Sequence, residues 1–303
     1  MITTGIQKSE SLWIVKFRIW LVHIASLAVL FVPATEPLIF AAAIGFFIRV
    51  FAWEAGSHRY FSHRSFKTSR VFQLVLAVIA AASGQRGPLW WATRHRAHHK
   101  YSDQILDPHS PVQRGFWYAH IGWAMDQQML DTDLDAAKDL ARFPELVWVN
   151  KYHYIFPYAL LMVFFLLGQY TGVFGQEKVG MSAMAWGFFL PTLLSLHATF
   201  SVNTLTHARK PDWFNIRRYE TADTTTNSWL LCIPTMGASW HNNHHRYMNS
   251  ARAGFYWWEL DLAYLALKLL SFFCVVWDLH PVPGKVLAEG RQHKNAPSIL
   301  RMK

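Results

Sequence analysis

Cysteine and acidic residues are scarce in this sequence of 303 residues. Its two cysteines, Cys232 and Cys274, form no CxxC pair, so neither a disulfide framework nor a zinc ribbon is predicted. The 19 acidic residues are outnumbered by 29 lysines and arginines, which gives a formal net charge of +10. The basic residues lie beside apolar stretches, where they are typical of membrane anchors rather than of a nucleic-acid site. We therefore expect no nucleic acid as a partner, but a phosphate-bearing lipid or coenzyme thioester.

The sequence also has no fixed-period repeat, no low-complexity tract and few strand signals, which favours helices. Its mean hydropathy of +0.10 is high for a soluble protein and low for a transporter. Four apolar stretches, each near the ~20 residues that a helix needs to cross a membrane, lie at residues 17–32, 38–57, 154–170 and 181–200. Short turns rich in Gly and Pro join them into two hairpins. The sequence predicts an all-α integral membrane protein with four transmembrane helices and a helical cap.

Positive charge is distributed unevenly between the two sides of the predicted membrane. The two hairpin turns contain one basic residue, Lys178, whereas residues 59–70, 86–114 and 209–218 are strongly basic. Loops rich in Lys and Arg stay on the cytoplasmic side. We expect the cap and both termini to be cytoplasmic, with the protein in a bacterial inner membrane and the first span retained rather than cleaved as a signal peptide.

Two shorter apolar stretches, residues 71–83 and 260–277, are too short or too interrupted by charge to be read as spans. We expect them to form helices that lie in the membrane interface or against the spans. The whole region 1–280 is predicted to be a single domain. Residues 281–303 have the composition of a mobile basic tail.

Histidine is abundant, with 16 residues in the chain. Eight of them form three groups: HRYFSH with His58 and His63, HRAHH with His95, His98 and His99, and HNNHH with His241, His244 and His245. Residues i, i+3 and i+4 share a helix face, so each HxxHH box is expected to present its three imidazoles to one place.

Such clustered imidazoles suit a metal better than a solvated basic surface, because they follow apolar spans or tight turns. Neither box is the HExxH of a zinc protease, and zinc needs only four ligands. Eight or more imidazoles suit two transition-metal ions, and iron is the redox-active choice for activating O2.

The order HRYFSH, HRAHHKYSD and HNNHH resembles the membrane fatty-acyl desaturases, specifically the stearoyl-CoA Δ9-desaturase-like branch. The resemblance extends from about residue 55 to residue 277 and includes DPHSP at 107–111, RGFWYAHIGW at 114–123 and NTLTH at 203–207. It implies O2-dependent formation of a cis double bond in a saturated long acyl chain, carried as an acyl-CoA or a phospholipid.

The resemblance also implies a centre of two iron ions held by nine histidines. These are His58, His63, His95, His98, His99, His207, His241, His244 and His245. Asn203 matches the family's asparagine that holds a water on one iron. Of the remaining histidines, His109 and His120 lie in family-like motifs and are candidates for supporting the ligands, whereas His23 and His197 are expected to be hydrogen-bonded core residues.

A kinked hydrophobic tunnel for the acyl chain is a further implication of the resemblance. Phe46 and Val50 match positions on the second span that set chain length, and Trp91 matches a tunnel-lining tryptophan at the kink. Packing or lipid contact is the alternative role for Phe46. Arg114 and other basic residues near the entrance are candidates for holding phosphates.

Two departures from the family pattern affect the expected partners. Arg94 replaces an acidic residue that helps to fix the coenzyme in animal members, so a phospholipid or carrier protein becomes an alternative acyl carrier. No HPGG of a fused cytochrome b5 follows Trp277, so electrons are expected from a separate donor of ferredoxin, cytochrome b5 or flavin reductase type. The rival functions are a fatty-acid or alkane hydroxylase, and a membrane metal transporter or metal-binding protein.

Overall fold

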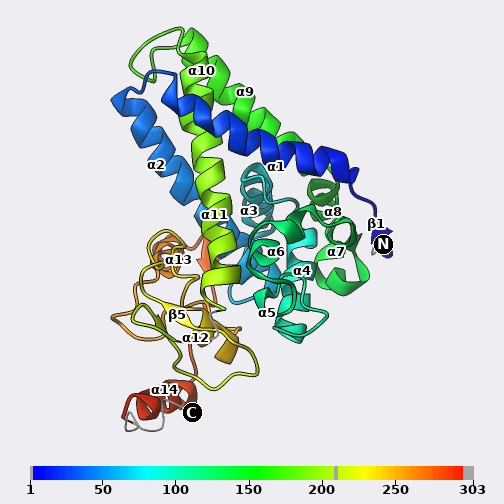
Figure 1. Ribbon diagram of the computed structural model, residues 1–303, viewed down its shortest axis with the longest axis vertical. Coiled ribbons are helices and arrows are strands. Elements are labelled where there is room, and N and C mark those ends of the chain that lie inside the picture. Colours follow the sequence, from blue (N-terminus) through cyan, green and yellow to red (C-terminus); the bar gives the residue numbers. More distant parts are fainter. Residues whose placement is uncertain (1–2, 208–210, 296–303) are drawn as a thin grey trace.

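A computed structural model describes residues 3–207 and 211–295 of the chain. Long helices occupy one end of the molecule, and a cap of shorter helices occupies the other (Figure 1). Within the described residues, three helices are long and apolar enough to cross a membrane: Leu12–Leu30, Glu36–Ser62 and Gly180–Leu205. Helices Pro144–Lys151 and Ile155–Tyr170, bent by 69° at a short break, make a fourth span if they are counted together. The mostly helical fold predicted from the sequence is thus observed, with three to four candidate spans.

The long helices are composites of several regular segments. Their parts are α1 (Leu12–Ser26) with the 3-10 helix η1 (Leu27–Leu30), α2 (Glu36–Phe51) with the π-helix η2 (Ala52–Ser62), α9 (Ile155–Tyr170), and α10 (Gly180–Ala183) with the π-helix η6 (Met184–Phe189) and α11 (Leu190–Leu205). The Thr35 hydroxyl accepts a hydrogen bond from the Leu38 amide, which caps the start of α2. The second helix continues five residues beyond the predicted end at residue 57, because π-helical winding carries it into the cap.

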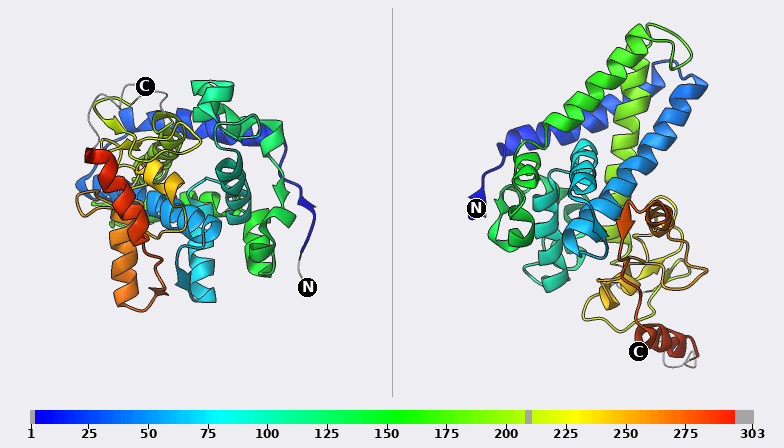
Figure 2. Two further views of the ribbon diagram at one scale, coloured as in Figure 1. Left: turned by 90° about the horizontal axis from the view of Figure 1, so that it is seen from below. Right: turned by 180° about the vertical axis from the view of Figure 1, so that it is seen from behind.

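The helices form the two predicted hairpins, whose connecting loops lie at the end of the molecule remote from the cap (Figure 2). Glycine permits close packing within the second hairpin. A Cβ atom at Gly187 would lie 2.3 Å from the ring of Phe164, and one at Gly168 would lie 2.6 Å from the Cβ of Ala183. Any larger residue would therefore separate α9 from its partner helix.

The cap is built from short helices and three pairs of two-residue antiparallel strands. Its helices are α3 (Arg70–Ala82), α4 (Pro88–Tyr101), α5 (Pro111–Arg114), α6 (Phe116–His120), η3 (Gly122–Met125), η4 (Gln127–Met129), η5 (Asp135–Ala137), α7 (Lys138–Ala141), α8 (Pro144–Lys151), α12 (His241–Arg246), α13 (Leu262–Phe272) and α14 (Gly284–Asn295). The strand pairs are β1 (Ile6–Gln7) with β3 (Thr132–Asp133), β2 (Lys67–Thr68) with β6 (Val276–Trp277), and β4 (Asn215–Ile216) with β5 (Asn227–Ser228). The first two pairs join segments far apart in the sequence.

The two shorter apolar stretches form helices α3 and α13, as expected. Helix α3 packs against η2, α8 and α9, and α13 packs against η2 and β6. Each keeps one apolar face exposed, on which Val71 is 76% and Phe272 is 79% accessible. These faces are consistent with contact to the membrane interface.

The expectation of a mobile tail is wrong for residues 284–295. Residues 284–295 form helix α14, in which Val286 is buried beside Tyr219 and Tyr256. Arg246 pairs with Glu289 on α14, and the Tyr219 hydroxyl donates to the carbonyl of Val286. The sequence pattern missed this helix because a single buried apolar residue anchors it. Residues 296–303 of the predicted tail lie outside the described residues.

A buried ionic cluster ties the end of the second span to the cap. Arg59 is fully buried, and its Nη2 atom lies 2.7 Å from Glu54 Oε1 and 2.9 Å from Asp261 Oδ1. Asp261 also accepts the Tyr264 amide and caps α13. Breaking a buried pair of this kind costs roughly 3–5 kcal/mol because it leaves a charge uncompensated.

Candidate metal centre

The nine histidines singled out by the sequence lie in two neighbouring clusters. The first cluster contains His58, His63, His95, His99 and His244, and the second contains His98, His207, His241 and His245. Within each cluster, one nitrogen from every imidazole lies within 4.8 Å of the others. The clusters adjoin, since the rings of His99 and His245 have centroids 4.4 Å apart.

π-helical winding brings the two histidines of HRYFSH together. On an α-helix, residues five apart point in different directions, but a π-helix bonds residue i to residue i+5. The amide of His63 donates to the carbonyl of His58 at 3.2 Å, which is such a bond. The two imidazole rings consequently lie 5.0 Å apart.

Each HxxHH box divides its histidines between the two clusters. On α4, His95 and His99 enter the first cluster, whereas His98 enters the second. On α12 the assignment is reversed, because His241 and His245 enter the second cluster and His244 the first. The expectation that each box serves one place is therefore wrong. The side chains at i and i+4 stay together, but the residue at i+3 is offset enough to face the other cluster.

The separations between imidazole nitrogens suit a shared metal ion. The Nε2 atoms of His63 and His95 are 2.8 Å apart, those of His58 and His244 are 2.9 Å apart, and those of His207 and His241 are 3.2 Å apart. Metal–imidazole bonds of about 2.1 Å meeting at right angles place neighbouring nitrogens about 3 Å apart. The same spacing makes all-protonated rings untenable, so the rings must be largely neutral, as metal binding requires.

Several buried nitrogens lack a partner among the described residues, and a metal in the second cluster would satisfy two of them. They are Nε2 of His98 and Nε2 of His245, whose other ring nitrogens lie beside Asp107 and Asp223 respectively. If each Nδ1 donates its proton to the carboxylate, each Nε2 presents a lone pair to the second cluster. The donor set thus fits a metal of the imidazole-preferring class.

Comparison with known proteins identifies the family. Residues 33–271 match the family model described as fatty acid desaturase. The chain belongs to this family. Among curated relatives, this desaturase is 34% identical to an acyl-CoA C20 Delta5-desaturase from Anemone leveillei, over 81% of this chain and 74% of the relative. It is 35% identical to an sn-1 stearoyl-lipid 9-desaturase from Anabaena variabilis, over 71% of this chain and 74% of the relative.

A third relative differs in the bond that its name describes. It is a hex-5-enoyl-[acyl-carrier protein] acetylenase from Moorena producens, 32% identical over 77% of this chain and 73% of that protein. Family membership makes this desaturase an oxidoreductase of lipid metabolism that acts on fatty acyl groups. The relatives differ in acyl carrier and in bond position.

Four carboxylates support the histidines of this desaturase, and sequence reasoning did not assign them. Glu54 Oε2 lies 2.7 Å from Nδ1 of His58, Asp107 Oδ1 3.0 Å from Nδ1 of His98, Asp103 Oδ2 3.2 Å from Nδ1 of His207, and Asp223 Oδ2 2.6 Å from Nδ1 of His245. A carboxylate on the outer nitrogen fixes the tautomer and the orientation of a ligand ring. Two features of the sequence could have indicated these carboxylates. They are the i, i+4 spacing of Glu54 and His58, and the two aspartates that follow the second histidine box.

The electrostatics of the site follow from burial and these carboxylates. Burial would raise the pKa of Asp107, but His98 outweighs it and holds the pKa of that carboxyl well below its usual range. Burial and the charges of neighbouring histidines lower the pKa of His95 and His244 well below the usual value, and that of His245 to about 4. The neutral imidazole is therefore the favoured form at these positions.

The other polar candidates from the sequence, Asn203, His109 and His120, do not all lie beside the clusters. Asn203 lines a small cavity together with His58, His98 and His241. His109 is buried with its ring 4.4 Å from that of His98 and lines the same cavity. His120 lies elsewhere, because its Nε2 atom is 3.0 Å from Nδ1 of His197.

The histidines within the spans form hydrogen bonds, as expected. Nε2 of His197 lies 3.1 Å from Nε2 of His23, whose Nδ1 donates to the carbonyl of Ile19. Together with His120, they form a row of three imidazoles outside both clusters.

Of the predicted tunnel residues, Trp91 lines a cavity. The small cavity adjoins a larger one, and Trp90, Trp91 and Trp123 line both. Val50 is fully buried in the core cluster that contains Trp91, and Phe46 packs against this cluster. Neither is among the described residues that line the two cavities, so a capping role for Phe46 stays a prediction.

Arg114 stands apart from both cavities as the described residues define them. Its guanidinium pairs with Asp126 at 3.2 Å and stacks on the ring of Tyr118. The cavity walls contain other arginines, Arg18 and Arg86 on the larger cavity and Arg94 on the smaller.

Proposed function

We propose that this protein is an O2-dependent acyl desaturase that introduces a cis double bond, at Δ9, into a saturated long acyl chain at a centre of two iron ions. The observation that carries the proposal is the pair of adjoining histidine clusters beside a cavity lined with tryptophan. His58, His63, His95, His99 and His244 would hold one iron, and His98, His207, His241 and His245 the other. Asn203, on the wall of the same cavity, would position a water at one of them.

The reaction converts –CH2–CH2–, O2, two electrons and two protons into –CH=CH– and two molecules of water. Two irons held by these histidines would supply the O2 activation and the electron transfer. The residues of this chain bind the acyl chain, hold it in place and exclude water, which is where most of the protein's contribution to such a reaction lies. Trp91 stacks on the ring of His95, with centroids 4.8 Å apart, and so places one wall of the cavity directly against the first cluster.

The proposed ligands carry no negative charge that would offset the positive charge of the metals. Every ligand that the two clusters offer is an imidazole, which is neutral when it binds a metal, so bound irons would keep their positive charge, unlike those of carboxylate-bridged di-iron bundles. The carboxylates Glu54, Asp107 and Asp223 instead contact the Nδ1 atoms of three of these imidazoles. This arrangement balances charge without occupying positions on the metal.

The proposed setting is a bacterial inner membrane with the centre and both termini in the cytoplasm. The clusters lie at the cap ends of the spans, which separates them from the intramembrane polar sites of a metal transporter. A cytoplasmic centre gives access to a separate electron donor of ferredoxin, cytochrome b5 or flavin reductase type. Acyl-CoA and phospholipid-bound acyl chains are both candidate substrates.

Expression in a bacterial host that lacks its own unsaturated fatty acids tests the proposal. Mass spectrometry of the total lipids should reveal a new cis double bond at Δ9 with the wild-type chain, and none with His98→Ala. A hydroxylated chain in place of the alkene would establish the hydroxylase alternative. Normal lipids despite an inserted, iron-loaded protein would refute the proposal.

A further inference from the structure

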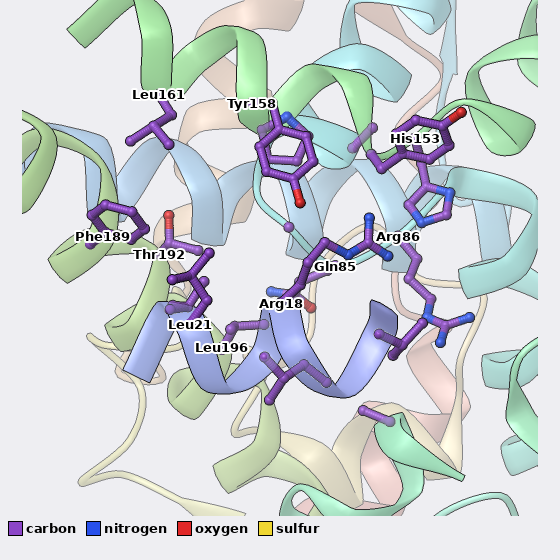
Figure 3. A pocket seen from close by; sticks show the side chains of 18 of the residues that line it. Arg18, Leu21, Gln85, Arg86, His153, Tyr158, Leu161, Phe189, Thr192 and Leu196 are labelled. Atoms are coloured by element: carbon purple, nitrogen blue, oxygen red, sulfur yellow. The ribbon is translucent and has the colours of Figure 1, made fainter. Parts of the chain in front are cut away.

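The larger cavity has one polar end and one apolar end. Figure 3 shows Arg18, Gln85, Arg86 and His153 grouped on one side, and Leu21, Leu161, Phe189 and Leu196 on the other. The polar end lies where α1 and α9 leave the cap. Arg18 is in the first third of the Leu12–Leu30 helix, and His153 is in the bend before α9.

Arg86 is a buried guanidinium whose charge has no ion-pair partner among the described residues. It is 9% accessible, its Nη1 donates to the carbonyl of Leu130, and its Nη2 has no hydrogen-bond partner there. Burial lowers its pKa to about 9. A charged group so placed is costly unless an anion accompanies it.

The nearest carboxylates are already committed to other cations. Glu10 pairs with Arg18 at 2.7 Å and lies 3.3 Å from Nε2 of His153. Asp131 pairs with Lys8 at 2.7 Å. Arg86 therefore remains as surplus positive charge on the cavity wall, beside the Trp90 ring at 4.6 Å.

Two membrane helices, α1 and α9, contribute to the wall of the cavity. Tyr158 on α9 lines it, is 45% accessible and points its hydroxyl into the space (Figure 3). The outer faces of both helices carry exposed apolar side chains, such as Phe17 at 63% and Met162 at 53%. A molecule that entered the cavity between these helices would come from the bilayer.

We propose that the acyl carrier is a membrane glycerophospholipid, whose phosphodiester is held by Arg86 and Arg18 at the polar end of this cavity. The proposal rests on the desaturase function proposed above and names its substrate class. One acyl chain would pass the three shared tryptophans to the histidines, and the other would lie along Leu21, Leu161 and Phe189.

Covalent distances favour a phospholipid over a coenzyme thioester. In a glycerophospholipid only the glycerol carbons separate the phosphate from the acyl ester, whereas in an acyl-CoA the long pantetheine arm separates the thioester from the phosphates. Arg86 is five residues before Trp91 and shares the cavity with it. An anion held by Arg86 would therefore share one cavity with the acyl chain, as the phosphate of a phospholipid would.

Native mass spectrometry of the full-length protein in detergent tests this without any turnover. The probes are dipalmitoylphosphatidylglycerol, stearoyl-CoA and inorganic phosphate. We expect the wild type to retain the phospholipid at least about ten-fold more tightly than stearoyl-CoA, with no displacement by millimolar phosphate. Arg86→Gln and Arg18→Gln should each weaken retention about ten-fold, the size of one lost charged hydrogen bond.

Matched variants separate charge from folding. Arg70→Gln removes an exposed arginine that pairs with Glu145 away from the cavity, and should retain the lipid as the wild type does. Arg86→Lys keeps the charge and should retain most of the affinity. Glu10→Gln releases Arg18 from its carboxylate and should strengthen retention. If Arg86→Gln fails to fold, Arg18→Gln and Glu10→Gln decide the question.

Equal phospholipid retention in Arg18→Gln, tighter binding of stearoyl-CoA, or displacement by inorganic phosphate would each overturn the inference. Because the readout is binding, its failure differs from that of the proposed function. Desaturation of acyl-CoA without phospholipid binding removes only this inference. Phospholipid binding in a protein that never forms a double bond removes only the desaturase proposal.

Discussion

His58 and His244 are 186 residues apart in the sequence, yet their Nε2 atoms lie 2.9 Å apart. His58 comes from the π-helical end of the second span and His244 from a six-residue helix in the cap. The first cluster therefore forms only when the C-terminal half of the cap closes on the spans. Any variant that loosens this closure should affect metal retention before it affects the helical content.

Replacing one histidine from each cluster should remove one iron at a time. His98 serves the second cluster and His244 the first, so His98→Ala and His244→Ala should each lower the iron content of anaerobically prepared protein from two to about one per chain. Both should abolish desaturation. His280→Ala, outside both clusters, is the control. Full iron content and turnover in either ligand variant would exclude the nine-histidine assignment.

Asp107 should matter for metal affinity although it lies outside the two clusters. Asp107→Asn removes the charge that orients His98 but keeps the size and one acceptor oxygen. We expect a loss of about 10- to 100-fold in iron affinity, measured by competition with a chelator. Asp135→Asn, an exposed aspartate in η5, should have no effect. Unchanged iron retention in Asp107→Asn would assign this carboxylate to loop structure alone.

Phe46 offers a test of chain-length control. If its ring closes the space beyond Trp91, Phe46→Ala should shift substrate preference toward acyl chains longer by a few carbons, because each newly buried methylene contributes ~0.8 kcal/mol. The bond position counted from the carboxyl end should not change. Phe47→Ala is the matched control, since Phe47 is the exposed neighbour on the same helix. Identical product profiles for both variants would leave Phe46 a packing residue.

The proposed orientation is testable by thiol labelling in intact cells. With Cys232 and Cys274 replaced by Ser, a cysteine at Gln176 should react with a membrane-impermeant reagent, and one at Lys100 should react only after lysis. Both positions are exposed, so burial does not decide the outcome. The reverse pattern would place the cap on the outer side and contradict the charge bias of the loops.

The iron-free protein should lose stability on acidification. Burial lowers the pKa of His63, His95, His99, His241, His244 and His245 in the folded chain. The unfolded chain therefore takes up protons near its ordinary histidine pKa of about 6.5 while the folded chain does not. Stability is fully present above that pH and falls below it. His98, whose pKa Asp107 raises against the effect of burial, opposes the trend.

Thermal unfolding followed by circular dichroism should show a midpoint that falls between about pH 7 and about pH 5. The variant His95→Gln removes one of the contributing groups and should show a shallower fall. A flat profile would mean that the clustered imidazoles already bind protons in the folded state.

The sequence by itself determined which histidines gather into the two clusters and roughly where the candidate membrane helices run. Apolar length predicts a span, and the three histidine groups predict eight of the imidazoles, because both features depend on local composition and spacing. The ninth, His207, followed only from the resemblance to the family. The mostly helical fold and the family could be inferred at that level. So could the position of Trp91, which is one helical turn before His95 and therefore shares its face.

Only the tertiary structure decided how those residues combine. Spacing in the sequence shows which side chains share a face of one helix. How the faces of α4, α12 and η2 come together depends on tertiary contacts, because these helices come from distant parts of the chain. For that reason the division of each box between two clusters escaped the sequence. The same holds for Asp223 beside His245, for α14 anchored by Val286, and for Arg86 facing a cavity between α1 and α9.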